Sequence, residues 1–169
     1  MRIDAIMNRR SIRRFAPRPV EREKLEAILR AAMQAPSGKN SQCWEFLVLE
    51  DRGDMDAVST MSPYAQCARN AQAMIVVLGQ RERIDPDVPI WIQDLSAATM
   101  NALTQIEAEG LGATWLCMYP FPERCAAMRD YFRLPDRVIP FCAIALGYKL
   151  QEKAPEDRYD PDRVHWGAY

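Results

Sequence analysis

Short apolar segments that alternate with stretches of helical periodicity constrain the fold of this chain most strongly. Each of the four segments has the length of a strand and falls far short of the roughly 20 apolar residues that a membrane-spanning helix needs. Polar sequence, often containing glycine or proline, separates them. The sequence therefore predicts four strands, at residues 44–49, 73–78, 113–118 and 138–146.

Helical periodicity is clearest between residues 25 and 33, where apolar residues recur with the spacing of one helix face. These residues are Leu25, Ile28, Leu29, Ala32 and Met33. The residue before Pro36 disfavours helical angles, so this helix is expected to end there. A second long helix is predicted at 94–109, with Asp94 or Ser96 as its N-cap. Shorter helices are predicted at 3–7, in pieces over 54–70, and at 122–132.

Length and charge limit the class of protein. The 169 residues suffice for one compact domain spanning 1–169. Lysine and arginine number 22 against 23 acidic residues, which gives a net charge of −1. A general nucleic-acid or membrane-surface binder would carry a surplus of positive charge, so neither partner is expected. The N-terminal sequence becomes charged before an apolar signal region can form, which favours a cytoplasmic location.

Cysteine and histidine content argues against several kinds of chemistry. The five cysteines form no C-x-x-C pair, and His165 is the only histidine. A structural zinc site would need several such ligands at close spacing, so no metal is expected. A nucleophilic triad would depend on His165, four residues from the end of the sequence. We therefore expect no catalytic side chain and look for a bound cofactor instead.

A basic segment near the N-terminus offers a candidate anion site. Residues 9–15 read R-R-S-I-R-R-F and carry four arginines and one hydroxyl. Guanidinium groups bind phosphate oxygens in pairs, and a serine hydroxyl adds a further hydrogen bond. A solvated basic turn at the end of a helix would explain the same residues, and this segment alone does not decide between the two interpretations.

The sequence A-P-S-G-K-N-S-Q-C-W at 35–44 offers a second candidate site. Ser37, Asn40 and Gln42 supply hydrogen-bonding groups, and Gly38 allows the backbone to approach a flat ligand closely. An ordinary connection between a helix and a strand also favours proline, serine, glycine and asparagine. The residues by themselves leave both interpretations open.

Taken in order, these motifs resemble those of the nitroreductase family of FMN-dependent oxidoreductases. R-R-S-I-R-x-F is followed by A-P-S-G-x-N-x-Q-x-W-x-F, and G-L-G-A-T-W at 110–115 follows the long central helix. A-L-G-Y at 145–148 resembles the closing strand of the family, and Arg158 with V-H-W at 164–166 resembles its basic C-terminal arm. The resemblance spans nearly the whole chain and indicates the short, single-domain branch.

The resemblance implies an α+β sandwich with a central, mainly antiparallel sheet flanked by helices. It also implies an obligate homodimer with two equivalent sites. The charged tail after Gly147 is poor in apolar residues and is either disordered or an arm laid on another surface. Because the tail closes with apolar or aromatic residues, at Val164, Trp166 and Tyr169, we expect residues 150–169 to extend onto the partner subunit.

The resemblance further implies which residues bind FMN. The N-terminal segment would hold the flavin phosphate and ribityl chain, and the P-S-G-x-N loop would reach the flavin of the other subunit. The strand after G-L-G would follow the edge of the isoalloxazine ring, mainly through its backbone, and a basic residue of the arm would close on the phosphate. In this order the residues are Arg9, Arg10, Ser11 and Arg13; Pro36, Ser37, Gly38 and Asn40; Trp115, Leu116, Cys117 and Met118; and Arg158.

Two parts of the site are not assigned by the resemblance. Longer relatives place polar side chains against the flavin pyrimidine, and Gln66 and Asn70 are unassigned candidates for that role. The connection at 80–93, where longer relatives build a substrate cover, is short, so the acceptor preference is not inherited.

The function implied is transfer of a hydride from NADH or NADPH, through FMN, to a small oxidised acceptor such as a nitroaromatic or a quinone, in a ping-pong scheme. Three alternatives remain open. One is a flavin-binding or regulatory protein with little turnover. Another keeps the fold for dehalogenation or flavin breakdown. The last disregards the resemblance and gives the basic N-terminal segment an RNA or an acidic partner.

Overall fold

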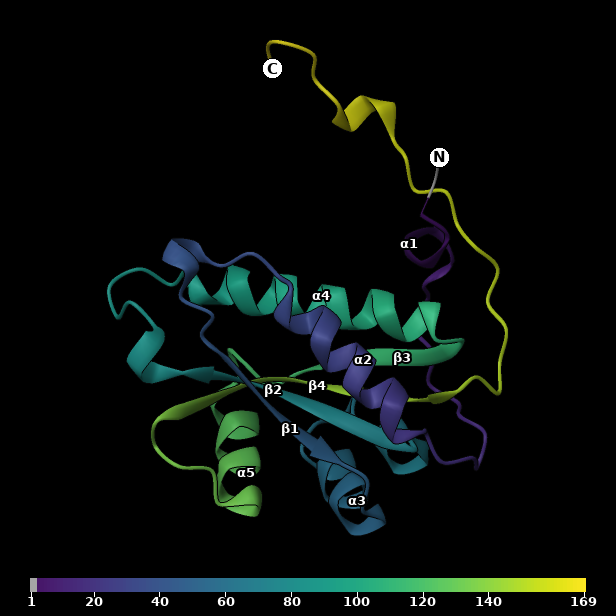
Figure 1. The fold of residues 1–169 in the computed structure, drawn as a ribbon, viewed down its shortest axis with the longest axis vertical. Coiled ribbons are helices and arrows are strands. Elements are labelled where there is room, and N and C mark those ends of the chain that lie inside the picture. Colours follow the sequence, from purple (N-terminus) through teal and green to yellow (C-terminus); the bar gives the residue numbers. More distant parts are fainter. Residues whose placement is uncertain (1–2) are drawn as a thin grey trace.

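A four-stranded antiparallel sheet forms the centre of the molecule. The structure is a computed structural model and describes residues 3–169. The strands follow the order β1-β2-β4-β3, so β2 and β4 are central and β1 and β3 lie at the edges (Figure 1). Their bounds are Trp44–Leu49 for β1, Ala73–Gln80 for β2, Leu111–Cys117 for β3 and Val138–Tyr148 for β4. All four predicted strands are present.

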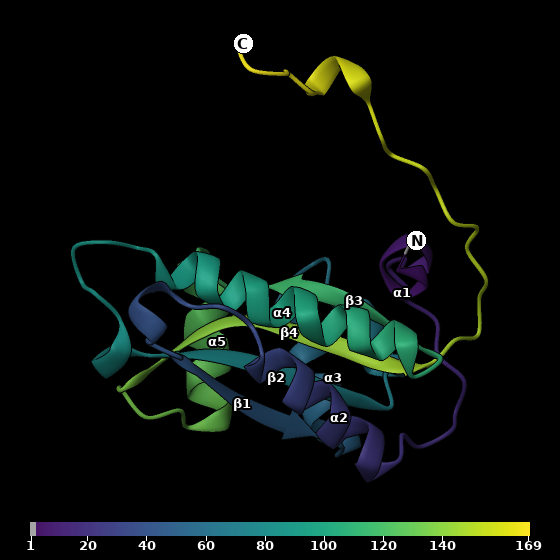
Figure 2. The same cartoon turned by 45° about the horizontal axis from the view of Figure 1, so that its top comes forward.

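Helices cover both faces of this sheet. The helices α2 and α4 lie on one face, and α3 and α5 lie on the other (Figures 1 and 2). The helices are α1 (Asp4–Asn8), α2 (Arg22–Met33), α3 (Arg52–Thr60), α4 (Trp91–Ala108) and α5 (Pro122–Phe132). Short 3-10 turns occur at Gly38–Asn40, Gln66–Asn70, Arg81–Arg83 and Pro161–Arg163. The predicted α+β sandwich with an antiparallel sheet is confirmed.

The two faces bury separate apolar cores. In β2, Ile75 and Val77 contribute to the core under α2 and α4, whereas Met74 and Val76 contribute to the core over α3 and α5. Because successive side chains of a strand point to opposite faces, a strand covered on both sides must be apolar at every position. This explains the uninterrupted run of apolar residues at 73–78.

The start of α4 differs from the sequence prediction. The helix begins at Trp91, three residues before the predicted start, and neither Asp94 nor Ser96 is its N-cap. Ser96 donates a hydrogen bond to the carbonyl of Ile92 at 2.6 Å, inside the helix. Asp94 is only 5% exposed and accepts hydrogen bonds from outside the helix. A residue typical of an N-cap is used here for a tertiary contact instead.

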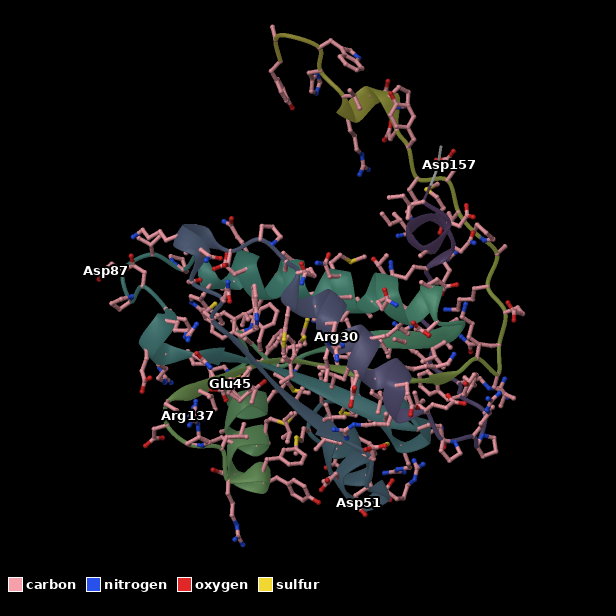
Figure 3. The ribbon with its side chains drawn as sticks, in the orientation of Figure 1. Arg30, Glu45, Asp51, Asp87, Arg137 and Asp157 are labelled. Carbon is pink, nitrogen blue, oxygen red and sulfur yellow. The ribbon has the colours of Figure 1, made fainter. Side chains whose placement is uncertain are left out.

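Polar contacts between distant segments lie at both ends of β4. Glu45 on β1 accepts hydrogen bonds from Arg137, just before β4, and from Gln80, the latter at 2.7 Å (Figure 3). The bond from Arg137 lowers the pKa of Glu45. Near the other end of β4, the Tyr148 hydroxyl donates to Glu21, at the start of α2, at 2.6 Å. That bond is the main cause that lowers the pKa of Glu21 to about 2.

The contact between Glu21 and Tyr148 makes a prediction about acid stability. The pKa of Glu21 is lower in the folded protein than its ordinary value of 4.5, so the stabilisation is complete above about pH 4.5 and is lost as the pH falls towards 2. We expect the Tyr148→Phe variant to be less stable than wild type near neutral pH, and the difference to shrink below pH 4.5. Urea unfolding at fixed protein concentration, at pH 7, 4 and 2.5, measures it.

The matched control is Tyr64→Phe, because the Tyr64 side chain is exposed and no hydrogen bond is described for its hydroxyl in residues 3–169. This variant should follow the wild-type pH dependence. A stability difference for Tyr148→Phe that stays the same down to pH 2.5 would contradict the assignment.

Candidate functional site

The N-terminal segment lies against the outer edge of β3. Ile12 donates its backbone N–H to the carbonyl of Ala113 at 2.9 Å, and Ser11 forms a parallel bridge with the same residue. The chain comes very close here, since a Cβ atom on Gly112 would lie 2.8 Å from the Cβ of Ile12. The glycine of the G-L-G motif at position 112 therefore allows the basic segment to sit on the strand.

In this segment the apolar side chains are buried and the neighbouring arginine side chains are exposed. Ile12 is 2% exposed and Phe15 is 5% exposed, and both belong to the core over α3 and α5. Arg13 and Arg14 between them are exposed. Anchoring two apolar side chains thus fixes the backbone that carries the arginines.

Beyond this contact, the edge of β3 borders a cleft of about 640 Å³, the strand-edge cleft. Its walls come from the N-terminal segment, the connection before the 3-10 turn at Gln66–Asn70, β3 and the start of α5. The lining residues are Arg13, Ser62, Tyr64, Ala65, Thr114, Trp115, Leu116, Cys117, Phe121 and Arg124.

The strand contributes main-chain donors to this cleft. The carbonyl of Ala113 points outward to Ile12, and the carbonyl of Cys117 accepts from the Arg124 guanidinium at 3.1 Å. In an antiparallel edge strand every second residue directs both backbone groups away from the sheet. The N–H groups of Trp115 and Cys117 have the same parity and therefore face outward, where the edge of a flat ligand can accept from them.

The side chains around the cleft are apolar with local positive charge. Arg13 and Arg124 are its two arginines, and the Arg124 guanidinium stacks on the Phe121 ring at 3.7 Å from the centroid. Trp115 Nε1 is the single buried side-chain nitrogen or oxygen without a hydrogen-bond partner within residues 3–169. Apolar walls, edge donors and two cations fit a planar ring that carries a phosphate.

A second hollow, of about 340 Å³, lies between the N-terminal segment and the C-terminal arm. Arg9, Arg10 and Arg158 line it together with Glu156. Arg10 pairs with Glu156 at 3.2 Å, and Arg158 pairs with the same carboxylate at 2.9 Å. Arg158 first, and Arg10 with it, lower the pKa of Glu156. The predicted arginines thus meet, but an acidic side chain offsets part of their charge.

The P-S-G-x-N loop lies elsewhere, at the N-terminal end of α4. Three residues in the loop and just after it have positive φ, with 53° for Lys39, 54° for Asn40 and 46° for Gln42. Such left-handed conformations cost about 1–3 kcal/mol each outside glycine. The Ser37 hydroxyl oxygen accepts from the backbone N–H of Gln42 at 3.0 Å. Strain of this kind concentrates at ligand-binding sites, where surrounding contacts enforce it.

The predicted site residues therefore form three groups within one protomer. Arg13, Trp115, Leu116 and Cys117 line the strand-edge cleft, and Arg9, Arg10 and Arg158 line the hollow beside the arm. The loop with Gly38 lines a third hollow of about 250 Å³, which shares no lining residue with the strand-edge cleft. Within the described protomer the loop and the cleft are separate.

Comparisons with known proteins decide the family. The family model "Nitroreductase family" matches residues 6–67 and 57–148. The chain belongs to the nitroreductase family. A protein of Archaeoglobus fulgidus, provisionally named NADH dehydrogenase/NAD(P)H nitroreductase, is 39% identical over 163 residues, which cover 95% of this chain and 94% of that protein.

Solved structures of nitroreductase-like proteins share the fold. A Clostridium acetobutylicum structure, provisionally described as an NADH oxidase, aligns with a TM-score of 0.94 at 43% identity, over 98% of this chain and 100% of the other. A provisionally described nitroreductase from Desulfovibrio desulfuricans, solved in complex with FMN, aligns with a TM-score of 0.82 at 30% identity, over 99% and 96% of the two chains. The family resemblance in the motifs is thereby confirmed.

Some residues of the candidate site were not found from the sequence. Arg124 and Phe121 line the strand-edge cleft from the start of α5, and Tyr64 lines it from the connection before the turn at Gln66–Asn70. The predicted start of a helix at Pro122 was the available signal, because it places Arg124 in the first turn after β3. Gln66 and Asn70, the unassigned candidates, do not line the cleft.

Of the four residues predicted to follow the flavin edge, Trp115, Leu116 and Cys117 line the strand-edge cleft and Met118 does not. Met118 is instead fully buried.

In residues 3–169 no group of three histidine, cysteine or acidic side chains could hold a metal ion. Over the same residues, no helix is long and apolar enough to cross a membrane.

The contact between Gly112 and Ile12 predicts that alanine at position 112 displaces the N-terminal segment. Its Cβ would lie 2.8–2.9 Å from three side-chain atoms of Ile12, so the segment must move outward. We expect Gly112→Ala to lower the free energy of unfolding by about 1–3 kcal/mol. In the wild type the Ile12 amide bonds the Ala113 carbonyl, and hydrogen exchange of this amide should become faster in the variant.

The matched control is Gly110→Ala, since Gly110 has a φ of 73° but no atom within 4 Å of its added Cβ. This variant pays only for the left-handed backbone and should leave the Ile12 amide protected. Equal exchange of that amide in both variants would show that the close approach does not position the segment.

Proposed function

We propose that this protein is an FMN-dependent oxidoreductase of nitroreductase type that takes a hydride from NADH or NADPH and passes it to a small oxidised acceptor. The observation that carries the proposal is the strand-edge cleft, with outward N–H groups on β3 and two arginines on apolar walls. Family membership and the FMN bound to the Desulfovibrio relative support the choice of cofactor.

The residues of the cleft have distinct roles in this proposal. The N–H groups of Trp115 and Cys117 would donate to the edge of the isoalloxazine ring, and Arg13 would bind the phosphate end. Arg124 holds the end of β3 in place through its bond to the Cys117 carbonyl. FMN, when bound, supplies the group that accepts and gives up a hydride, so the cleft needs no catalytic acid or base.

The exposed side of the cleft would admit the nicotinamide and then the acceptor in turn. This order is a ping-pong scheme, in which the two substrates use the same space one after the other. Nitroaromatics and quinones are the acceptor classes we propose as test substrates, because both are flat and take up electrons readily.

We propose further that the functional unit is a homodimer. The P-S-G-x-N loop would then complete the strand-edge cleft of the partner subunit, and the C-terminal arm would lie on that subunit. The arm is held to its own protomer by Lys153, whose ammonium donates to the Ser11 carbonyl at 2.9 Å, and by Glu156, which pairs with Arg10. Beyond these contacts it projects from the body of the protein (Figure 1). Trp166 beyond that point is 88% exposed, as expected for a side chain that awaits a docking surface.

The proposal predicts a yellow protein that nicotinamide nucleotides reduce. We expect the purified or FMN-supplemented protein to show the absorption of an oxidised flavin. Without oxygen, NADH or NADPH should bleach it, and a quinone or nitroaromatic should restore it. A flavin spectrum that neither nucleotide bleaches would favour a flavin-binding protein with little turnover. A protein that takes up no FMN would overturn the proposal.

The proposed phosphate contact of Arg13 can be tested against its neighbour. Arg13 lines the strand-edge cleft, whereas Arg14 is exposed and does not line it. Loss of a charge-assisted hydrogen bond costs about 1.5–3 kcal/mol, so Arg13→Ala should weaken FMN binding roughly 10- to 100-fold. Arg14→Ala, which removes the same charge, should bind FMN like wild type. Equal losses in both variants would indicate a general charge effect instead.

A further inference from the structure

A buried carboxylate joins the P-S-G-x-N loop to the first turn of α4. Asp94 is 5% exposed and lies within the first turn of an 18-residue helix. One of its oxygens accepts from the backbone N–H of Gly38 at 2.9 Å, and the other accepts from the Ser41 hydroxyl at 3.1 Å. The Cys43 thiol lies 3.9 Å from the second oxygen. Asp94 therefore contacts Gly38 near the start of the loop, Ser41 near its end, and Cys43 just after it.

Asp94 suits this position for physical reasons. A buried carboxylate needs several donors, and the loop supplies a backbone N–H, a hydroxyl and a thiol. The thiol stays protonated near neutral pH because burial raises the pKa of Cys43, so it remains a donor. The positive end of the helix dipole also favours a negative charge in the first turn of α4.

The loop between these contacts is held in a strained conformation. Lys39, Asn40 and Gln42 all have φ near 50°. Two short bonds support the turn locally, from the Asn40 N–H to the Ser37 carbonyl and from the Ser41 N–H to the Gly38 carbonyl, both 3.0 Å. Since an unrestrained chain would leave such angles, contacts from outside the loop must enforce them. Asp94 makes such contacts on both sides of the strained residues.

The space around Gly38 adds a second constraint. A Cβ at that position would lie 2.7 Å from the Ile90 side chain. Gly38 is thus pressed against the residue that precedes α4 while its N–H points to Asp94. These two contacts fix Gly38 against the N-terminal end of α4.

We infer that Asp94 is a positioning residue for flavin binding: it sets the left-handed conformation in which the loop at 37–42 presents Ser37, Gly38 and Asn40 to the flavin of the partner subunit. The inference rests on the proposed function for its ligand. The conformational part, that Asp94 dictates the loop, rests on the contacts described above alone.

The test uses three variants of the full chain. Asp94→Ala removes the two oxygens that accept from the Gly38 N–H and the Ser41 hydroxyl. Asp94→Asn keeps the shape and one acceptor oxygen. Thr99→Val is the matched control, because Thr99 is buried on the same helix and its hydroxyl bonds, within residues 3–169, the Leu95 carbonyl and the Cys142 sulfur but not the loop.

The first measurement is FMN affinity, by fluorescence titration of the flavin-free protein. We expect Asp94→Ala to weaken FMN binding at least about tenfold, because buried donors lose their acceptor and the loop relaxes. Asp94→Asn should restore part of the affinity, and Thr99→Val should stay within about twofold of wild type. An Asp94→Ala protein that binds FMN like wild type would overturn the inference.

The second measurement needs no flavin. Hydrogen exchange of the Asn40, Ser41 and Gln42 amides in the flavin-free protein reports directly on the loop. We expect Asp94→Ala to accelerate exchange at these amides and to leave the strands unchanged. An acceleration of equal size in β2 and β4 would mean that Asp94 supports the fold in general, and the inference would fail.

Ser41→Ala offers a variant that leaves α4 intact. Removing this hydroxyl should change the loop in the same direction as Asp94→Ala, and the two changes together should be less than additive. Full additivity would separate the two residues and contradict a shared role. If wild-type protein takes up no FMN, the proposed function fails, while the exchange experiment still decides whether Asp94 sets the loop.

Discussion

The open edge of β3 is the constraint on which the site depends. An edge strand exposes a row of backbone donors and acceptors, and proteins usually cover such a row or bind something to it. Here the first half of the edge is covered, because Ile12 bonds Ala113 above Gly112. The second half, at Trp115 and Cys117, borders the strand-edge cleft instead. One strand therefore anchors the basic segment and offers the donors that a flat cofactor requires.

The two ends of the chain depend on the same arrangement. After Ile12, the Ala16 N–H bonds the Tyr148 carbonyl, and the Leu150 N–H bonds the Arg14 carbonyl. The N-terminal segment and the start of the arm thus run side by side where β4 ends. As a result, Arg10 reaches Glu156, and arginines of the N-terminal segment and of the arm line one hollow. The buried side chains of Ile12 and Phe15 thus fix the backbone that brings Arg10 to Glu156.

Local sequence determined the strands well because each strand is a continuous apolar run, and β2 is buried on both faces. The prediction failed where a tertiary contact replaced a local one. Asp94 has the chemistry of an N-cap, yet it bonds Gly38, which lies 56 residues earlier. Arg124 was missed because its role depends on how α5 packs beside Phe121 and the end of β3. Spacing in the sequence contains neither of these contacts.

The separation of the loop from the strand-edge cleft explains why two chains would be needed for one site. A loop with three left-handed residues costs free energy to maintain, and its nearest hollow shares no residue with the cleft within the described protomer. In the proposed dimer the strained loop would contribute to the flavin site of the partner subunit and not to the site of its own protomer. In that dimer the bonds from Gly38 and Ser41 to Asp94 would hold the loop ready for the flavin of the partner subunit. A preorganised loop gives up less conformational entropy when the flavin binds.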